Sequence, residues 1–198
     1  MTQYPMRILP LILLAASLLL SGCTSGVVSK NPLSSPKFAT TDPRLEGLWR
    51  AKVGSGYDYF AFGKVSAKGI NLFLQFGKPG DLASSNSTNF FVTRTPRHSY
   101  LNISNDYERD ANADKPSLNQ DDYTFLEYHI TNRGDLILSW LDPDIFTKAI
   151  AAGKLRGNSN SSYPYLTDSS DHILTFIEAS DPKKMFFPLS KLTRTGAP

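Results

Sequence analysis

Short runs of aromatic and β-branched residues alternate along this chain with clusters of Gly, Pro, Asn, Asp and Ser. Such runs, separated by turn-forming residues, are typical of an antiparallel β domain. We expect eight strands, at residues 48–52, 57–65, 70–76, 89–95, 99–104, 123–131, 136–141 and 185–194. In the third run, Ile70, Leu72 and Leu74 alternate with Asn71 and Gln75, which is the period of a strand.

The sixth and seventh runs predict a hairpin of defined register. They are joined by Asn132-Arg133-Gly134, a loop in which the glycine can adopt the left-handed conformation of a bulged turn. Pairing Thr131 with Asp135 then gives one wholly apolar face, formed by Leu126, Tyr128, Ile130, Leu136, Leu138 and Trp140. The reverse face carries Phe125, Glu127, His129, Ile137 and Ser139. We expect the apolar face to meet the core.

Two amphipathic helices are expected between the seventh and eighth strands. The first begins at Asp142-Pro143, an N-cap carboxylate followed by a proline suited to the first turn, and it ends at Gly153. The second begins among residues 167–170 and runs to about Ala179, where Asp181-Pro182 stops it. The pattern therefore predicts a mainly β fold with two short helices before the last strand.

The N-terminus has a different pattern. Arg7 is followed by an unbroken run of low polarity from Ile8 to Leu20. This run is shorter than the ~20 residues of a membrane-spanning helix and is typical of a secretory signal. The sequence Leu20-Ser21-Gly22-Cys23 resembles the lipobox of bacterial lipoproteins, although an ordinary signal peptide followed by a chance cysteine is the alternative.

The lipobox resemblance implies cleavage after residue 22 and attachment of diacylglycerol and palmitate to Cys23. These lipids would hold the protein at the membrane. Thr24 in the next position implies, in a Gram-negative host, retention at the outer membrane facing the periplasm. Residues 23–42 have few large apolar side chains, so we expect a lipid anchor and flexible tether before a folded domain over residues 43–198.

Composition limits the chemistry of the exported domain. Cys23 is the only cysteine, so no disulfide can hold the fold. Removing residues 1–22 leaves a net charge of about +2, too balanced for a nucleic-acid-binding surface. The core alone must stabilise the domain.

A second resemblance concerns the two ends of the domain. Gly47-Leu48-Trp49, preceded by Asp42-Pro43-Arg44, resembles the Gly-x-Trp signature at the start of lipocalins. This resemblance implies an antiparallel eight-stranded barrel in which a basic residue near the end of the last strand, here Arg194, packs across Trp49. The chain departs from the family because its two helices precede the last strand. The alternative is that Trp49 is a core aromatic of another β domain.

Motifs of catalysis and of metal or cofactor binding are missing. The three histidines, His98, His129 and His172, have no metal-ligand spacing, and neither a Gly-x-Ser-x-Gly nor a Gly-rich phosphate motif occurs. Residues 110–121 imitate a calcium loop but have Lys115 where the turn needs glycine, so we expect a solvated acidic loop. We expect no cofactor, and an enzyme is the least favoured class.

Two functions are consistent with these patterns. The first is a lipid-anchored envelope protein that binds a small hydrophobic ligand or an envelope component in its barrel. The candidate ligand-binding residues are Phe125, Glu127, His129 and Ser139, with Tyr59, Phe60, Phe62 and Phe73 as further candidate aromatics. The second is a structural or protein-interaction lipoprotein with a filled core. The same strand face would then be ordinary solvent-facing surface.

Overall fold

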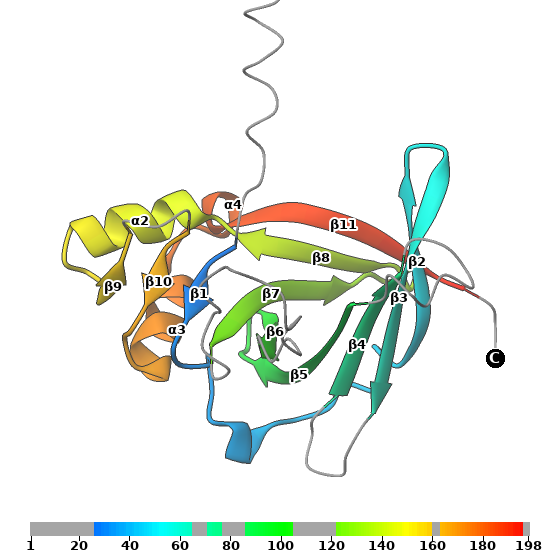
Figure 1. Ribbon diagram of the computed structural model, residues 1–198, viewed down its shortest axis with the longest axis horizontal. Coiled ribbons are helices and arrows are strands. Elements are labelled where there is room, and N and C mark those ends of the chain that lie inside the picture. The colour runs from blue at the N-terminus through cyan, green and yellow to red at the C-terminus, as the bar shows by residue number, and fades with distance from the viewer. Residues whose placement is uncertain (1–25, 65–70, 77–85, 105–121, 160–162, 196–198) are drawn as a thin grey trace, which may run out of the picture.

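The computed structural model describes residues 26–64, 71–76, 86–104, 122–159 and 163–195, which form a β-rich body with short helices at one side (Figure 1). The long strands are β2 (Gly47–Val53), β3 (Gly56–Lys64), β4 (Asn71–Phe76), β5 (Asn86–Arg94), β6 (Ser99–Ser104), β7 (Tyr123–Ile130), β8 (Leu136–Leu141) and β11 (Phe186–Arg194). The short elements are β1 (Val28–Ser29), β9 (Gly157–Asn158), β10 (Tyr165–Leu166), the 3-10 helix η2 (Pro36–Phe38) and helices α2 (Pro143–Ala151), α3 (Ser170–Ala179) and α4 (Pro182–Met185).

The strands form one mixed sheet in the order β6-β5-β4-β3-β2-β11-β8-β7-β1-β10-β9. All pairs among the eight long strands are antiparallel, and β1 and β10 form a parallel pair. β6 also pairs along its whole length with β7, from Ser99 opposite Tyr128 to Ser104 opposite Tyr123. The prediction of a mainly β domain is confirmed, and the eight predicted strands are the eight long ones, with ends shifted by at most three residues.

The predicted hairpin register is confirmed. Ile130 pairs with Leu136, Tyr128 with Leu138 and Leu126 with Trp140, while Gly134 has a φ of 82°. The apolar face of this hairpin meets a first core on the inner face of the sheet. The buried members of this first core are Leu45, Trp49, Ala51, Phe60, Phe62, Phe90, Val92, Leu101, Leu126, Tyr128, Leu136, Leu138 and Leu192.

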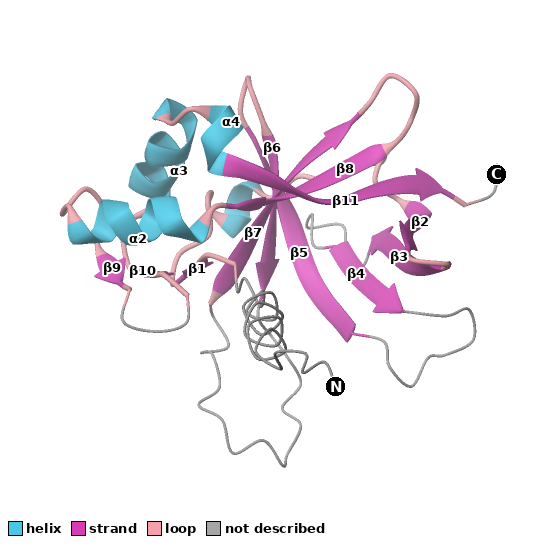
Figure 2. Ribbon diagram, turned by 90° about the horizontal axis from the view of Figure 1, so that it is seen from above, coloured by secondary structure: helices cyan, strands magenta, loops and turns pink. Residues whose placement is uncertain are grey.

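A second core lies between the opposite face of the sheet and the helices, which gather on one side of it (Figure 2). The helices contribute Phe146, Ala149, Ile173 and Ile177, and the strands contribute Tyr100, Phe125 and Leu141. Both predicted helices are confirmed, with Asp142 and Ser169 as their N-caps. A further turn, α4, begins where the sequence predicts only a stop, because Asp181 accepts from the amide of Lys183 and caps it.

The N-terminal segment differs from its prediction. Residues 23–42 are expected to be a flexible tether, yet Val27, Val28 and Leu33 are buried. β1 pairs with both β7 and β10, and the Leu33 amide donates to Oδ1 of buried Asn102 at 2.7 Å. The tether prediction is therefore wrong from residue 26 onwards. Few apolar residues suffice to order the segment because strand pairing satisfies its backbone.

Among the residues that the structure describes, no helix has the length and apolar composition needed to cross a membrane.

Candidate functional site

One end of the sheet is held together by Trp49 and Arg194. The indole is 1% exposed and donates from Nε1 to the carbonyl of Leu45 at 2.7 Å. The Arg194 guanidinium lies 4.5 Å from the centre of the indole ring, and it donates to the carbonyls of Glu46 and Arg44, each at 2.6 Å. The predicted packing of Arg194 across Trp49 is confirmed. The pair fastens the chain before β2 to the end of β11.

A buried carboxylate lies beside this pair. Asp42 accepts from the side chain of Arg44 at 2.7 Å, from Arg94 at 2.8 Å and from the Tyr128 hydroxyl at 2.9 Å. Burial alone would raise the pKa of Asp42, but hydrogen bonds from Arg44 and Tyr128 outweigh burial and lower that pKa to about 2. Burial and the Asp42 charge together raise the pKa of Tyr128 to about 12. Asp42 is therefore an ionised latch between the N-terminal segment, β5 and β7.

The sequence gives only a partial signal for this cluster. In the sequence, Asp42 is noticed only as part of the polar residues that precede Gly47-Leu48-Trp49. Arg94 and Tyr128, in contrast, are far from Asp42 along the chain and carry no motif. Their role follows only from the folded arrangement.

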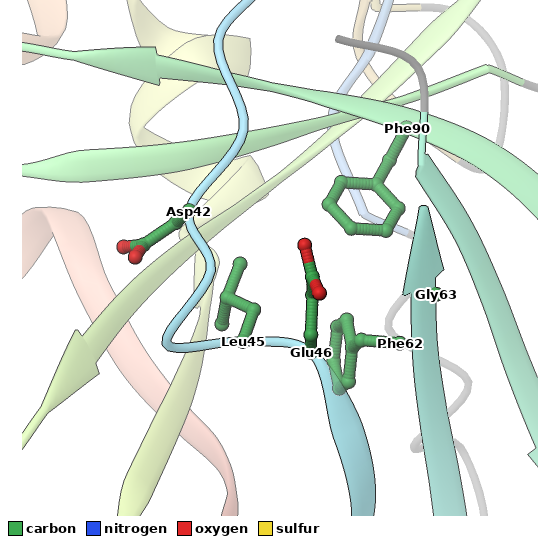
Figure 3. A pocket seen from close by; sticks show the side chains of 6 residues that line it. All are labelled: Asp42, Leu45, Glu46, Phe62, Gly63 and Phe90. Carbon is green, nitrogen blue, oxygen red and sulfur yellow. The ribbon is translucent and has the colours of Figure 1, made fainter. Parts of the chain in front are cut away.

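The hollow beside the latch is shallow. Its empty volume is about 170 Å³ when the solvent at its open side is included, and no enclosed part of it is large enough for a water molecule. It is lined by Asp42, Leu45, Glu46, Phe62, Gly63 and Phe90. Figure 3 shows the Asp42 carboxylate pointing away from the rings of Phe62 and Phe90. The hollow therefore presents the packed surface of the first core and does not lead into a binding cavity.

The further candidate aromatics, predicted to line a pocket, differ in their burial. Phe60 and Phe62 are buried in the first core, whereas Tyr59 is partly exposed. Phe73 lies on β4, whose side chains are outside the described part of the structure. The described side chains on the inner face of the sheet thus fill the space where a ligand was expected.

The four candidate ligand-binding residues lie on the outer face of β7 and β8. Phe125 is 1% exposed in the second core beneath the helices, Ser139 is buried, Glu127 is partly buried and His129 is exposed. The prediction that these residues line a pocket inside a barrel is wrong, because strand alternation sends Leu126 and Tyr128 inward in their place. The alternative of a plain solvent face is also incomplete, since only His129 is exposed.

Glu127 has a histidine partner that the sequence does not indicate. Nδ1 of His98 on the β5–β6 turn lies 3.6 Å from Oε1 of Glu127, and both side chains are mostly buried. The His98 ring also packs against Phe186, with 5.1 Å between ring centres. Burial raises the pKa of Glu127, while His98 and a hydrogen bond from Ser139 partly oppose that rise. The carboxylate thus lies between the histidine and the serine.

This order of groups differs from that of a serine hydrolase. In a Ser-His-acid relay the imidazole lies between the hydroxyl and the carboxylate, so that it can take the hydroxyl proton. Here Glu127 lies between Ser139 and His98. The cluster can hold β6, β7 and β8 together, but it has no relay that would activate Ser139.

Two further polar clusters attach the helices to the sheet. Glu178 at the end of α3 accepts from the Tyr100 hydroxyl at 2.6 Å and from Thr95 at 3.0 Å. Asp168, before α3, accepts from the amide and side chain of Arg156, and Nδ1 of His172 lies 2.8 Å from its Oδ2. These contacts have structural roles that account for the third histidine.

Metal chemistry has no visible site in the described residues, where no group of three His, Cys, Asp or Glu side chains converges. The calcium-like stretch at residues 110–121 lies outside the described part of the structure, as does Cys23.

Comparison with known proteins gives no match: no protein-family model, no curated protein and no solved structure resembles this chain.

Proposed function

We propose that this protein is a lipid-anchored envelope protein that acts through its surface and does not carry a small ligand inside its fold. The observation that carries the proposal is the filled first core, in which Trp49, Phe60, Phe62 and Phe90 occupy the inner face of the sheet. Ligand-binding β barrels need an open interior, and side chains fill the interior of those that bind nothing there. The structural or protein-interaction function is therefore favoured over the ligand-binding one.

We also propose that the eight long strands constitute a lipocalin-like barrel. The pairing of β6 with β7 supports this, because it gives each long strand a long neighbour on both sides. The packing of Arg194 over Trp49 supports it as well. The helices before β11 and the added strands β1, β9 and β10 set this arrangement apart from the family pattern.

The anchor is tested through Cys23. The full precursor is expressed in a bacterium that processes lipoproteins, with and without Cys23→Ser. We expect palmitate labelling and recovery in the membrane fraction for the unchanged chain, and loss of both for the variant. A Thr24→Ser variant serves as the control and keeps both properties. Labelling that survives Cys23→Ser contradicts the anchor.

The filled interior is tested with a fluorescent apolar probe. Titration of the Cys23→Ser chain, which carries no lipid to sequester the probe, is expected to show no saturable binding. Phe62→Ala removes an aromatic ring beside the hollow. Because large cavities lined by apolar groups can admit apolar molecules, this variant is the comparison for probe binding. Saturable binding by the chain with Phe62 intact would contradict the proposal and restore the ligand-binding alternative.

A further inference from the structure

The outer face of β2, opposite the first core, is exposed to solvent. Trp49 and Ala51 are buried in the first core, so strand alternation places Leu48, Arg50 and Lys52 on the outer face. All three of these outer residues are exposed. The helices gather on the other side of the molecule from β2 and β3 (Figure 2). This part of the sheet therefore presents its outer side chains to a partner.

The register of the β2–β3 pair brings tyrosines beside the two cations of β2. Arg50 pairs with Tyr59 and Lys52 with Tyr57, and residues opposite each other in an antiparallel pair share a face. Tyr57 is 40% exposed, and the Arg50 guanidinium lies 4.7 Å from the centre of its ring. A guanidinium stacked on a ring keeps its N–H donors in its own plane, where two of them can bind one carboxylate.

The outer face of β2 and β3 is positively charged. Within the described part of the chain, neither Arg50 nor Lys52 forms an ion pair. Asp58 lies opposite Ala51 and so belongs to the other face of the pair. On β11, the exposed Thr193 lies opposite Arg50 and adds a hydroxyl group to the same face. Cations and hydroxyl groups without a neighbouring carboxylate complement an anionic partner that is rich in oxygen.

The layout of this face suits an extended polymer. Successive outer side chains along a strand are ~7 Å apart and lie on a regular, gently twisted surface. Sugar rings have C–H groups on their faces and hydroxyl groups at their edges. They can therefore pack against an exposed aromatic ring such as Tyr57 while their oxygens meet donors beside it. A glycan chain that carries carboxylates would use both the cations and the ring.

We propose that the outer face of β2 and β3 binds a carboxylate-bearing glycan strand, which is the chemistry of peptidoglycan. Arg50 and Lys52 bind its carboxylates, and Tyr57 packs against a sugar ring. This inference rests on the proposed function and names the partner of the surface, because an envelope lipoprotein facing the periplasm meets this polymer. The protein would then connect the membrane, through its lipid, to the cell wall.

The test is co-sedimentation of the purified full chain with insoluble peptidoglycan sacculi, in a mild detergent that keeps the protein in solution with or without its lipid. Intact sacculi are compared with sacculi whose carboxylates have been converted to neutral amides. Arg50→Gln with Lys52→Gln removes two charges from the outer face. Lys183→Gln with Lys184→Gln removes the same charge from exposed positions on α4 and is the matched control. Tyr57→Ala and Tyr57→Phe test the ring.

We expect saturable binding to intact sacculi that weakens about tenfold in the Arg50 and Lys52 double variant and hardly changes in the α4 double variant. Tyr57→Ala should also weaken binding, whereas Tyr57→Phe should keep most of it. Circular dichroism verifies that each variant is folded. Equal binding by the two double variants, or to the two kinds of sacculi, overturns the proposal, and so does the absence of binding.

Two further results separate this site from a protein partner and from the anchor. A photo-crosslinker in place of Tyr57 that joins a protein in cells, while sacculi are not bound, indicates a protein partner and overturns the glycan site. Co-sedimentation needs no lipid, so binding by a chain that is not acylated would support the glycan site and overturn the anchor. An acylated chain that does not bind sacculi overturns the glycan site alone.

Discussion

Replacement of Trp49 by alanine is expected to be among the most damaging single changes in the domain. The side chain is almost completely buried in the first core, and truncation of such an aromatic costs ~3–5 kcal/mol. The change also removes the partner of the Leu45 carbonyl and the ring over which Arg194 lies. Since whole domains are stable by only ~5–15 kcal/mol, this loss is a large fraction of the total.

Trp49→Phe separates the contribution of the aromatic ring from that of the hydrogen bond to the Leu45 carbonyl. Phenylalanine keeps an aromatic ring for Arg194 but has no donor for Leu45, and an unpaired buried carbonyl costs ~1–3 kcal/mol. Leu48→Ala is the control on the same strand, because Leu48 is 37% exposed on the opposite face. A change at such a surface position is expected to stay within ~0.5 kcal/mol.

Urea unfolding followed by far-ultraviolet circular dichroism measures all three variants, since this signal does not depend on the indole. With a denaturant slope of ~2 kcal/mol per molar, Trp49→Ala should lower the midpoint by about 2 M, Trp49→Phe by about half that, and Leu48→Ala hardly at all. A loss below ~1 kcal/mol for Trp49→Ala would refute the reasoning that this residue fastens the start of β2 to the end of β11.

Three further changes test the buried carboxylates by urea or acid unfolding. The lowered pKa of Asp42 means that its charge stabilises the fold above its ordinary pKa of 3.8 and ceases to do so as the pH falls to about 2. Asp42→Asn should therefore lower the stability of the domain at neutral pH. This loss of stability should disappear near pH 2. The pKa of Glu127 is raised by burial, so its ionisation costs stability as the pH rises above its ordinary pKa of 4.5. The stability of Glu127→Gln relative to the unchanged chain should therefore increase as the pH rises above that value, and a constant difference contradicts this. Asp168→Ala should cost ~2–3 kcal/mol and speed hydrogen exchange at the amides of Arg156 and Ser169, and unchanged exchange contradicts its role.

Local sequence patterns predict much of this fold because short loops limit the possible pairings. The loop Asn132-Arg133-Gly134 allows only one sensible register, and the inward and outward sides of β7 and β8 follow from it. The N-caps Asp142 and Ser169 likewise act within their own helical turns. Patterns of this kind determine the local geometry from residues that are close together in the sequence.

The contacts around the candidate site depend instead on long-range pairing. His98 meets Glu127 because β6 pairs with β7, and residues 105–121 separate these strands, so no loop length fixes their register. The position of Phe125 likewise depends on the helices that cover it, and Asp42 depends on Arg94 and Tyr128 from distant strands. A hydrophobic pattern shows that a side chain is on one face, but it does not show what covers that face.

The N-terminal segment is the clearest case of tertiary structure overriding composition. Its polar sequence is typical of a disordered linker, yet Val27 and Leu33 fill space in the second core and Val28 is buried as well. Asn102 supplies the remaining specificity, since its side chain accepts from the Leu33 amide and donates to Thr93. The site that receives the segment exists only after β5 and β6 have paired.

The pairing of β1 has a mechanical consequence for a protein held by its N-terminus. The amides of Val28 and Lys30 donate to Pro164 and Leu166, and β7 pairs with β1 on the other side. A pull on Gly26 along β1 would load these hydrogen bonds together in shear. In the proposed lipid-anchored protein, movement of the membrane would thus be transmitted to the sheet as a whole, and the domain would move with it as a rigid body.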